Sequence, residues 1–408
     1  MAVEFDLWSR KLLARIDQLA PVLVDLSHRI HANPELGHEE RKAAAWCTEL
    51  LRSHGFEVTK PVAGLETAFR ATYEIGHGGA GARPAIAFLA EYDALPGIGH
   101  ACGHNIIAAS AVGAGIALAE TLAGDARNGD ACCPGGPPRS ATIFVDGTPA
   151  EETTGGKIAM VAAGLYSDVA AAISMHPETY SGAGSTCLGT RRLTFSYHGR
   201  AAHAAAEPDK GINALDAAIQ TFTAVNALRQ HVRPDVRIHG IITHGGEAPN
   251  IVPAFSQTVF EARSVDVEYH RDVLEKVRDC ARAAALATGA TLQIKEDETF
   301  EPTRRNAPLT RLALEAMELL GLLARDMSDE CFSASTDFGN VSQVCPAIAP
   351  MIRTGTPGMS LHHADFAAAA GSPDGDAAVI AAAKVMSLVA ARLILEPEKL
   401  AEARAAFA

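Results

Sequence analysis

The spacing of apolar residues along the chain predicts alternating helices and strands. Over several long segments apolar side chains recur with the period of one helix face. These segments are Leu12 to His31, Arg41 to His54, Ile106 to Thr121, Asn213 to Arg229, Val265 to Ala287, Leu309 to Leu320 and Asp376 to Leu395. Short apolar runs of strand length lie at 85–90, 141–145 and 169–175. Because strands alternate with helices, we expect an α/β fold with a mainly parallel sheet and flanking helices.

The middle of the chain follows a different order of elements. Its predicted elements are a strand at 192–197, a helix at 213–229, strands at 236–243 and 258–264, a helix at 265–287 and a strand at 291–296. This β-α-β-β-α-β order is typical of a ferredoxin-like α+β unit. We therefore predict an inserted domain at 188–302, which divides a first domain into residues 1–187 and 303–408.

Composition and charge narrow the class of protein. The chain has 408 residues, 48% of them hydrophobic, which is enough for two domains with sizeable cores. The net charge of −13 argues against nucleic acid as a partner, because such binding needs a basic face. The N-terminus lacks the apolar stretch of a signal peptide, and Lys384 and Arg392 interrupt the longest late apolar segment, Ala377 to Leu395. We expect a cytoplasmic protein that does not cross a membrane.

The cysteines predict thiols and not disulfides. The eight cysteines show no repeated pair spacing, and without an export signal we expect them to be reduced. Residues 124–140 contain Pro-Gly-Gly-Pro-Pro and the adjacent Cys132 and Cys133, a composition typical of a surface loop. We interpret this segment as an unstructured insertion and not as a redox site.

Side chains that bind metals follow each of the three short apolar runs. Cys102 and His104 come after the first run, two residues apart and separated by a glycine. Glu151 and Glu152 follow the second run, and His176 follows the third. A thiolate beside an imidazole suits Zn²⁺ or another borderline metal. Because reactive groups gather at the carboxyl ends of parallel strands, these residues predict a single metal-binding crevice.

These residues also have structural interpretations. A cysteine and a histidine in a Gly-rich loop can be a packed thiol and a surface imidazole, and the adjacent glutamates can cap a helix that starts near Gly155. Asp93 can form a turn or orient a ligand. Near the C-terminus, His362 and His363 present adjacent imidazoles in a loop.

Several ordered motifs together resemble a known family of enzymes. The motifs are Glu-Tyr-Asp-Ala-Leu-Pro at 91–96, Ala-Cys-Gly-His at 101–104, Pro-Ala-Glu-Glu at 149–152, Met-His-Pro at 175–177, Gly-Arg-Ala-Ala-His at 199–203 and Leu-His-His-Ala-Asp-Phe at 361–366. They resemble the M20 metallopeptidase family, in particular its amidohydrolase branch of aminoacylases, auxin-conjugate hydrolases, aminobenzoyl-glutamate hydrolases and an aminoacyl-lysine dipeptidase. The resemblance runs from about Asp25 to Leu395, and the segment 335–342 resembles the dipeptidase subgroup.

The resemblance implies a zinc-exopeptidase-like fold and a role for each motif residue. It implies two divalent metal ions per subunit, Zn or Mn, held by Cys102, His104, Glu152, His176 and His362. Glu151 is then the general base, which suits a carboxylate beside a two-metal centre that activates water. His203 and Asn250 are implied substrate contacts, with His203 stabilising the oxyanion across the interface of a homodimer formed through the insert.

The sequence departs from the family pattern in two places. Other M20 branches place a histidine where this chain has Glu91, so no imidazole is available there. At the C-terminal motif the chain offers two histidines, and counting back from Phe366 favours His362 over His363.

These observations predict metal-dependent hydrolysis of the amide bond of an N-acyl amino acid or an unusual dipeptide, with Glu151 as general base. An alternative is an exopeptidase that acts on ordinary dipeptides. An alternative of another class is a catalytically inactive metal-containing binding protein, against which the presence of Glu151 argues. Arg263 is a weaker candidate for binding a substrate carboxylate, because a guanidinium binds carboxylates bidentately.

Overall fold

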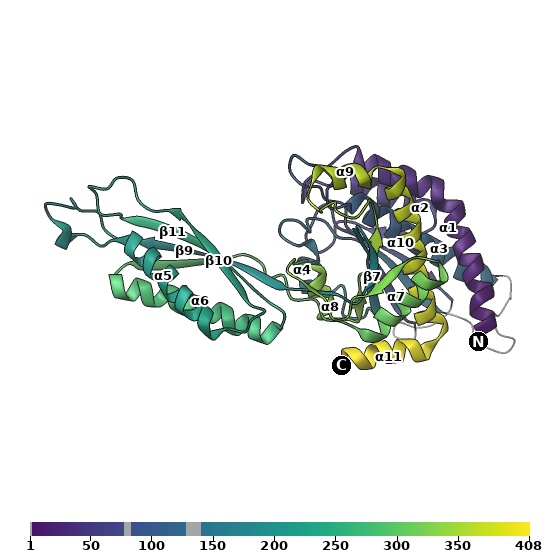
Figure 1. The fold of residues 1–408 in the computed structure, drawn as a ribbon. Coiled ribbons are helices and arrows are strands. Elements are labelled where there is room, and N and C mark those ends of the chain that lie inside the picture. Colours follow the sequence, from purple (N-terminus) through teal and green to yellow (C-terminus); the bar gives the residue numbers. More distant parts are fainter. Residues whose placement is uncertain (1, 77–82, 128–139) are drawn as a thin grey trace. The chain divides into compact units, whose positions relative to one another are not determined.

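The computed structural model describes residues 2–76, 83–127 and 140–408, which form two compact units (Figure 1). The first unit comprises 1–186, 304–330 and 340–408, and the second comprises 187–303 and 331–339. The segment with Cys132 and Cys133, predicted to be a surface loop, lies outside the described residues.

The first unit is built on a six-stranded sheet. Its strands, in spatial order, are β1 (Glu57–Thr59), β2 (Phe69–Ile75), β4 (Ala141–Gly147), β3 (Ala85–Ala90), β5 (Ala171–Ile173) and β15 (Ala347–Ile348). β3 pairs in parallel with β4 and β5, and β5 with β15, whereas β1 and β2 form an antiparallel edge. The mainly parallel α/β sheet predicted from the alternating pattern is therefore confirmed.

Three long helices pack together in the core of this unit: α1 (Ala2–His31), α3 (His104–Arg127) and α10 (Pro373–Leu395). A Cβ atom on Gly115 of α3 would lie 2.3 Å from Cγ2 of Val145 on β4, so glycine allows the helix to lie directly on the sheet. α3 and α10 are long and apolar enough to cross a membrane, but 94% and 67% of their apolar stretches are buried inside the structure. Packing in the core accounts for their composition.

Shorter elements complete the first unit. A four-stranded sheet has the order β13 (Ala324–Asp326), β7 (Ser181–Ala183), β16 (Met351–Arg353) and β6 (His176–Glu178). The remaining helices are α2 (Arg41–Ser53), α4 (Gly156–Ala162), α7 (Ala307–Leu319), α9 (Ala364–Ala370), α11 (Pro397–Phe407) and α8 (Phe338–Ser342), which begins in the second unit. A two-stranded pair joins β8 (Thr186–Cys187) to β14 (Cys331–Phe332), and all of it except Thr186 belongs to the second unit.

The second unit has the predicted ferredoxin-like order. Its elements are β9 (Gly189–His198), α5 (Ala214–Leu228), β10 (Arg237–His244), β11 (Phe255–Ser264), α6 (Val267–Thr288) and β12 (Thr291–Glu296). The strands form an antiparallel sheet in the order β10-β11-β9-β12, with a hydrophobic core of its own that includes Phe195, Tyr197 and Phe260.

The second unit also contains a segment that the sequence-based boundaries assign to the first domain. Residues 331–339 join it because the Leu188 amide donates to the carbonyls of Phe332 and Ala334. Arg263 also donates to the carbonyl oxygen of Ser333 at 2.9 Å. The apolar pattern of residues 331–339 could not predict these contacts, because most of them are made by backbone groups.

Candidate metal centre

Six of the residues predicted from the sequence gather where the strands of the parallel sheet end. They lie in the loop after β3, at the start of α3, in the turn after β4, at the start of β6 and in the loop before α9. Their ligand atoms form three groups within which every atom lies within 4.8 Å of the others. The groups are Cys102, His104 and His176; Cys102, Glu152 and His362; and His104, Glu151 and Glu152.

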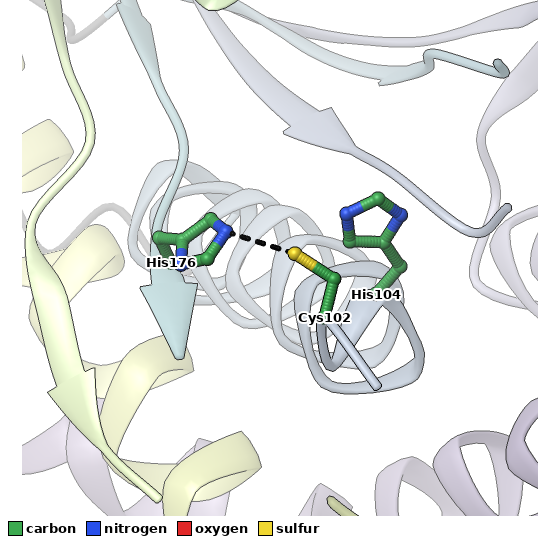
Figure 2. Close-up of side chains that lie close together, drawn as sticks. All are labelled: Cys102, His104 and His176. Atoms are coloured by element: carbon green, nitrogen blue, oxygen red, sulfur yellow. Dashed lines mark hydrogen bonds between the residues drawn. The ribbon is translucent and has the colours of Figure 1, made fainter. Parts of the chain in front are cut away.

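Cys102 and His176 point their donor atoms at each other (Figure 2). The Sγ to Nε2 distance is 3.5 Å, and Nδ1 of His176 lies 2.8 Å from the Pro177 carbonyl oxygen, so Nδ1 is the donor and Nε2 faces the thiol. A Cβ atom on Gly103, whose φ is +75°, would lie 2.5 Å from Cγ of Pro177. Only glycine lets the two chain segments approach closely enough to bring Cys102 to His176.

The local environment of this pair suits a bound cation. Burial raises the pKa of the Cys102 thiol, so a cation is needed to hold it as the thiolate that binds metals. Exclusion of water lowers the pKa of His176, which favours the neutral ring that coordinates a metal.

Asp93 orients His104. Its Oδ1 lies 3.0 Å from Nδ1 of His104, and its Oδ2 accepts the backbone N–H of Glu152 at 3.0 Å. Burial opposes both charges, but their mutual attraction outweighs it: the pKa of His104 is raised well above its usual value and that of Asp93 is lowered. The contact with His104 favours the second of the two interpretations left open for Asp93, in which it orients a ligand.

The second ring nitrogen of His104 shows that the site fits a metal. Nε2 is buried and has no hydrogen-bond partner among the described residues. Its neighbouring carboxylate oxygens are Oε2 of Glu91 at 3.5 Å, Oε1 of Glu152 at 3.9 Å and Oε2 of Glu151 at 4.0 Å. A buried polar atom without a partner destabilises the fold by roughly 1–3 kcal/mol, and a cation between the ring and the carboxylates would remove that cost.

The separations between donor atoms also fit metal ligands. Tetrahedral ligands of one zinc ion at about 2.0–2.3 Å lie roughly 3.3–3.8 Å from each other. The 3.5 Å separation between Sγ of Cys102 and Nε2 of His176 falls in this range, and Nε2 of His362 lies slightly closer, 3.2 Å, to Oε1 of Glu152. A mixed set of thiol, imidazole and carboxylate donors is typical of Zn and neighbouring transition metals.

His362 belongs to this cluster, whereas His363 does not. The His362 amide donates to the Ala101 carbonyl at 2.9 Å, its φ is +62°, and its hydrogen bond with Glu152 raises the pKa of the ring. His363 is exposed at the N-cap of α9, and its side chain caps nothing there. The geometry favours the choice of His362 made by counting back from Phe366.

The two adjacent glutamates do not cap the helix that follows them. α4 has Gly155 as its N-cap, with a φ of +74° and no side-chain cap. Instead, the Glu151 and Glu152 side chains, each 12% exposed, point into the cluster around His104. Burial alone would raise the pKa of Glu152, but His362 and His104 outweigh it and lower that pKa.

His203 and Asn250 lie in the second unit and not with the six clustered residues. Both are exposed, and the Asn250 carbonyl accepts the N–H of Ala204 at 3.0 Å. Nδ1 of His203 accepts the backbone N–H groups of Ala205 and Ala206 at 3.3 and 3.1 Å. A neutral His203 ring therefore carries its proton on Nε2, where it is a hydrogen-bond donor.

The weaker candidate Arg263 is engaged inside the second unit. It pairs with Glu261 at 2.6 Å and donates to the carbonyl of Ser333 and the hydroxyl of Ser335. These contacts give it a structural role.

Sequence reasoning missed a buried ion pair at the edge of the cluster. Nζ of Lys157, a fully buried side chain, lies 2.8 Å from Oε1 of Glu91, whose other oxygen faces His104. The sequence shows only a lysine five residues after the paired glutamates, and its burial, which lysine rarely adopts without a partner, becomes visible in the structure alone. At the position where the motif of other branches has histidine, this chain therefore has Glu91, and Lys157 balances the charge of Glu91.

The mainly parallel sheet and the candidate metal ligands at its strand ends define an α/β protein with a candidate metal centre, and comparisons with known proteins show its family. Residues 188–289 match the family model of the peptidase dimerisation domain of M20 proteins. The chain is 38% identical to Xaa-Arg dipeptidase of Mus musculus, over 100% of this chain and 93% of that protein. It is 31% identical to one of the two chains of p-aminobenzoyl-glutamate hydrolase of Escherichia coli, over 73% of this chain and 62% of that one.

Solved structures show the same fold. A dinuclear metal-binding peptidase of the M20 family from Bacillus subtilis aligns with a TM-score of 0.69 at 20% identity, over 93% of this chain and 99% of that one. An aminobenzoyl-glutamate utilization protein from Klebsiella pneumoniae aligns with a TM-score of 0.67 at 20% identity, over 93% and 98%. The chain belongs to the M20 peptidase family, as its motifs predicted, and it is an enzyme of the hydrolase class.

His362 and His363 give a matched pair of variants that tests the ligand set. His362→Ala removes a donor that contacts Glu152, so we expect the affinity for Zn²⁺ or Mn²⁺ to fall by about 10-fold or more. His363→Ala should bind metal like the parent protein. Titration against a metal-binding dye, with metal content by mass spectrometry, measures both. Metal loss in His363→Ala with retention in His362→Ala would contradict the assignment.

Proposed function

We propose that this protein hydrolyses the amide bond of dipeptides that end in arginine, or of closely related N-acyl amino acids, at a two-metal centre. The buried cluster of thiol, imidazole and carboxylate donors around the unpartnered Nε2 of His104 carries the proposal. Cys102, His104, Glu152, His176 and His362 would hold the metals, either Zn or Mn. When bound, these ions supply Lewis-acid polarisation of the scissile carbonyl and lower the pKa of water.

Glu151 is the proposed general base. Its side chain is 12% exposed, and its Oε2 lies 4.0 Å from Nε2 of His104. A carboxylate beside the proposed metal ligands suits the acceptance of a proton from the attacking water and its delivery to the leaving amine. The presence of a base in this position argues against a binding protein without activity.

The substrate that we propose is based on the names of the relatives. The match to a relative named as an Xaa-Arg dipeptidase spans the whole chain, whereas the match to the aminobenzoyl-glutamate hydrolase chain spans 73% of it. We therefore place dipeptides with a C-terminal arginine first and p-aminobenzoyl-glutamate second.

A substrate panel tests this order. Purified protein loaded with Zn²⁺ or Mn²⁺ is given Xaa-Arg, Xaa-Lys and Xaa-Ala dipeptides, N-acetyl amino acids and p-aminobenzoyl-glutamate, with products identified by mass spectrometry. We expect the highest kcat/KM for an Xaa-Arg dipeptide. Faster cleavage of p-aminobenzoyl-glutamate would reverse the order, and no cleavage of any amide would overturn the proposed function.

The adjacent glutamates should separate chemistry from metal binding. Glu151→Gln keeps the shape of the side chain but removes its basicity, so kcat should fall by ~10²-fold or more while metal content stays near that of the parent protein. Glu152→Gln weakens a proposed ligand, so metal content should fall. Steady-state kinetics and metal analysis on both variants check this. If Glu151→Gln empties the site while Glu152→Gln leaves it filled, the two roles are reversed.

We further propose a homodimer in which His203 completes the active site of the partner protomer. The match to a dimerisation domain and the position of β10 at the edge of the second unit's sheet support a dimer. Ile241 and Ile242 on that edge strand are 63% and 42% exposed, which suits burial against a second copy. The Nε2–H donor of His203 suits the charge that develops on the substrate carbonyl oxygen.

Mixed dimers test the contribution of His203. His203→Ala should lower kcat by roughly 10²-fold, the scale of one oxyanion donor, without loss of metal. Mixing it with Glu151→Gln should restore activity, because each heterodimer contains one site without either change. Native mass spectrometry verifies the exchange of protomers. Exchanged mixtures that are no more active than their parents would exclude a site shared between protomers.

A further inference from the structure

A buried carboxylate outside the metal cluster holds the backbone beside the proposed general base. Glu40 is fully buried immediately before α2, but it does not cap that helix, whose first amides bond to Glu35 instead. Oε1 of Glu40 accepts the N–H of Ala150 at 2.8 Å, and Oε2 accepts the hydroxyl of Thr67 at 2.9 Å. Both oxygens of Glu40 are thus used by groups distant in the sequence.

Ala150 needs such support because of its backbone conformation. Its φ is +61°, in the left-handed region that a residue with a Cβ atom adopts only when its surroundings impose it. A Cβ atom on Gly37 would lie 3.1 Å from Cα of Ala150, so the chain before α2 lies directly against the turn. The turn closes through a bond from the Gly155 amide to the Ala150 carbonyl at 2.9 Å.

The amide on the other side of Glu151 is held in the same way. The N–H of Glu152 donates to Oδ2 of Asp93 at 3.0 Å, and Asp93 is itself buried. Two buried carboxylates from separate segments, Glu40 and Asp93, therefore accept hydrogen bonds from the backbone N–H groups of Ala150 and Glu152, the residues on either side of Glu151. With both neighbours fixed, the backbone sets the direction in which the Cα–Cβ bond of Glu151 points.

We infer that Glu40 is a positioning residue for Glu151, because its hydrogen bond to Ala150 fixes the strained turn from which the base projects. The inference rests on the proposed role of Glu151 as general base. Glu40 touches none of the donors of the metal cluster through its described hydrogen bonds, and Asp93 still holds Glu152 when Glu40 is removed. Loss of Glu40 should therefore impair the base more than the metal site.

Three variants and a stability control test the inference in the metal-loaded protein. Glu40→Ala removes both bonds, Glu40→Gln keeps an acceptor for Ala150, and Thr67→Val removes only the hydroxyl bond. Asn306→Ala removes a buried N-cap of α7, far in sequence from the turn, and serves as a control for lost stability. The measurements are kcat and KM, metal content, Tm, and hydrogen exchange of the peptide 148–156.

Glu40→Ala should lower kcat by about 10-fold or more, with KM and metal content near those of the parent protein, because small displacements of a catalytic group are costly. Glu40→Gln should restore most of the lost kcat, and Thr67→Val should show a smaller fall. Hydrogen exchange of 148–156 should be faster in Glu40→Ala than in Asn306→Ala, whose Tm falls without a fall in kcat.

A kcat for Glu40→Ala within twofold of the parent protein, or a fall in kcat matched by loss of metal, would overturn the inference. If Glu40→Ala does not fold, Thr67→Val decides: unchanged kcat and unchanged exchange of 148–156 would overturn it. If the parent protein cleaves none of the amides, that result contradicts the proposed function but does not test Glu40. Hydrogen exchange of 148–156 then tests Glu40 without an activity assay, and equal exchange in Glu40→Ala and Asn306→Ala would overturn its role.

Discussion

The two hydrogen bonds of Asp93 connect the sheet to the chemistry of the site. One carboxylate oxygen lies 3.0 Å from Nδ1 of His104, and the other accepts the amide of Glu152 at 3.0 Å. The first bond sets the tautomer of His104, so that Nε2 faces the cluster, and the second fixes the turn that carries both glutamates. Because Asp93 is buried three residues after β3, the sheet fixes the placement of groups from two other segments, the start of α3 and the turn after β4.

The cluster concentrates negative charge where water is scarce. Glu91, Asp93, Glu151 and Glu152 surround His104, and Lys157 balances Glu91. Buried carboxylates cost several kcal/mol each unless a cation or hydrogen bonds compensate them. A pair of divalent ions would give that compensation, so the same charges that disfavour the metal-free site would strengthen metal binding.

Much of the fold was predictable from the sequence because its periodicity follows burial. The apolar run at 85–90 coincides with β3, and the alternating run at 291–296 coincides with β12. β2 was missed because Arg70 and Glu74 interrupt its apolar pattern. The structure explains Arg70: it lies directly opposite Asp146 of β4 and forms an ion pair with it at 2.6 Å. A cross-strand partner 76 residues away leaves no local signal.

In the candidate site, too, the residues with a local sequence motif could be predicted, whereas contacts between distant segments could not. Cys102, His104, Glu151, Glu152, His176 and His362 could be proposed from motifs at strand ends, and the structure brings them together. The support around them could not be predicted. Glu40 looks like an ordinary polar residue before a helix, and its bond to Ala150 depends on how segments 110 residues apart meet.

α3 begins at His104 and continues through the core, so the metal site and the fold share one element. Ion binding is therefore linked thermodynamically to the folding of the first unit: each ion that prefers the folded state adds its binding free energy to the stability of α3 and its neighbours. The second unit has a separate hydrophobic core and receives no such contribution. Metal supply in the cell would thus govern how long the first unit stays folded as well as how fast the enzyme works.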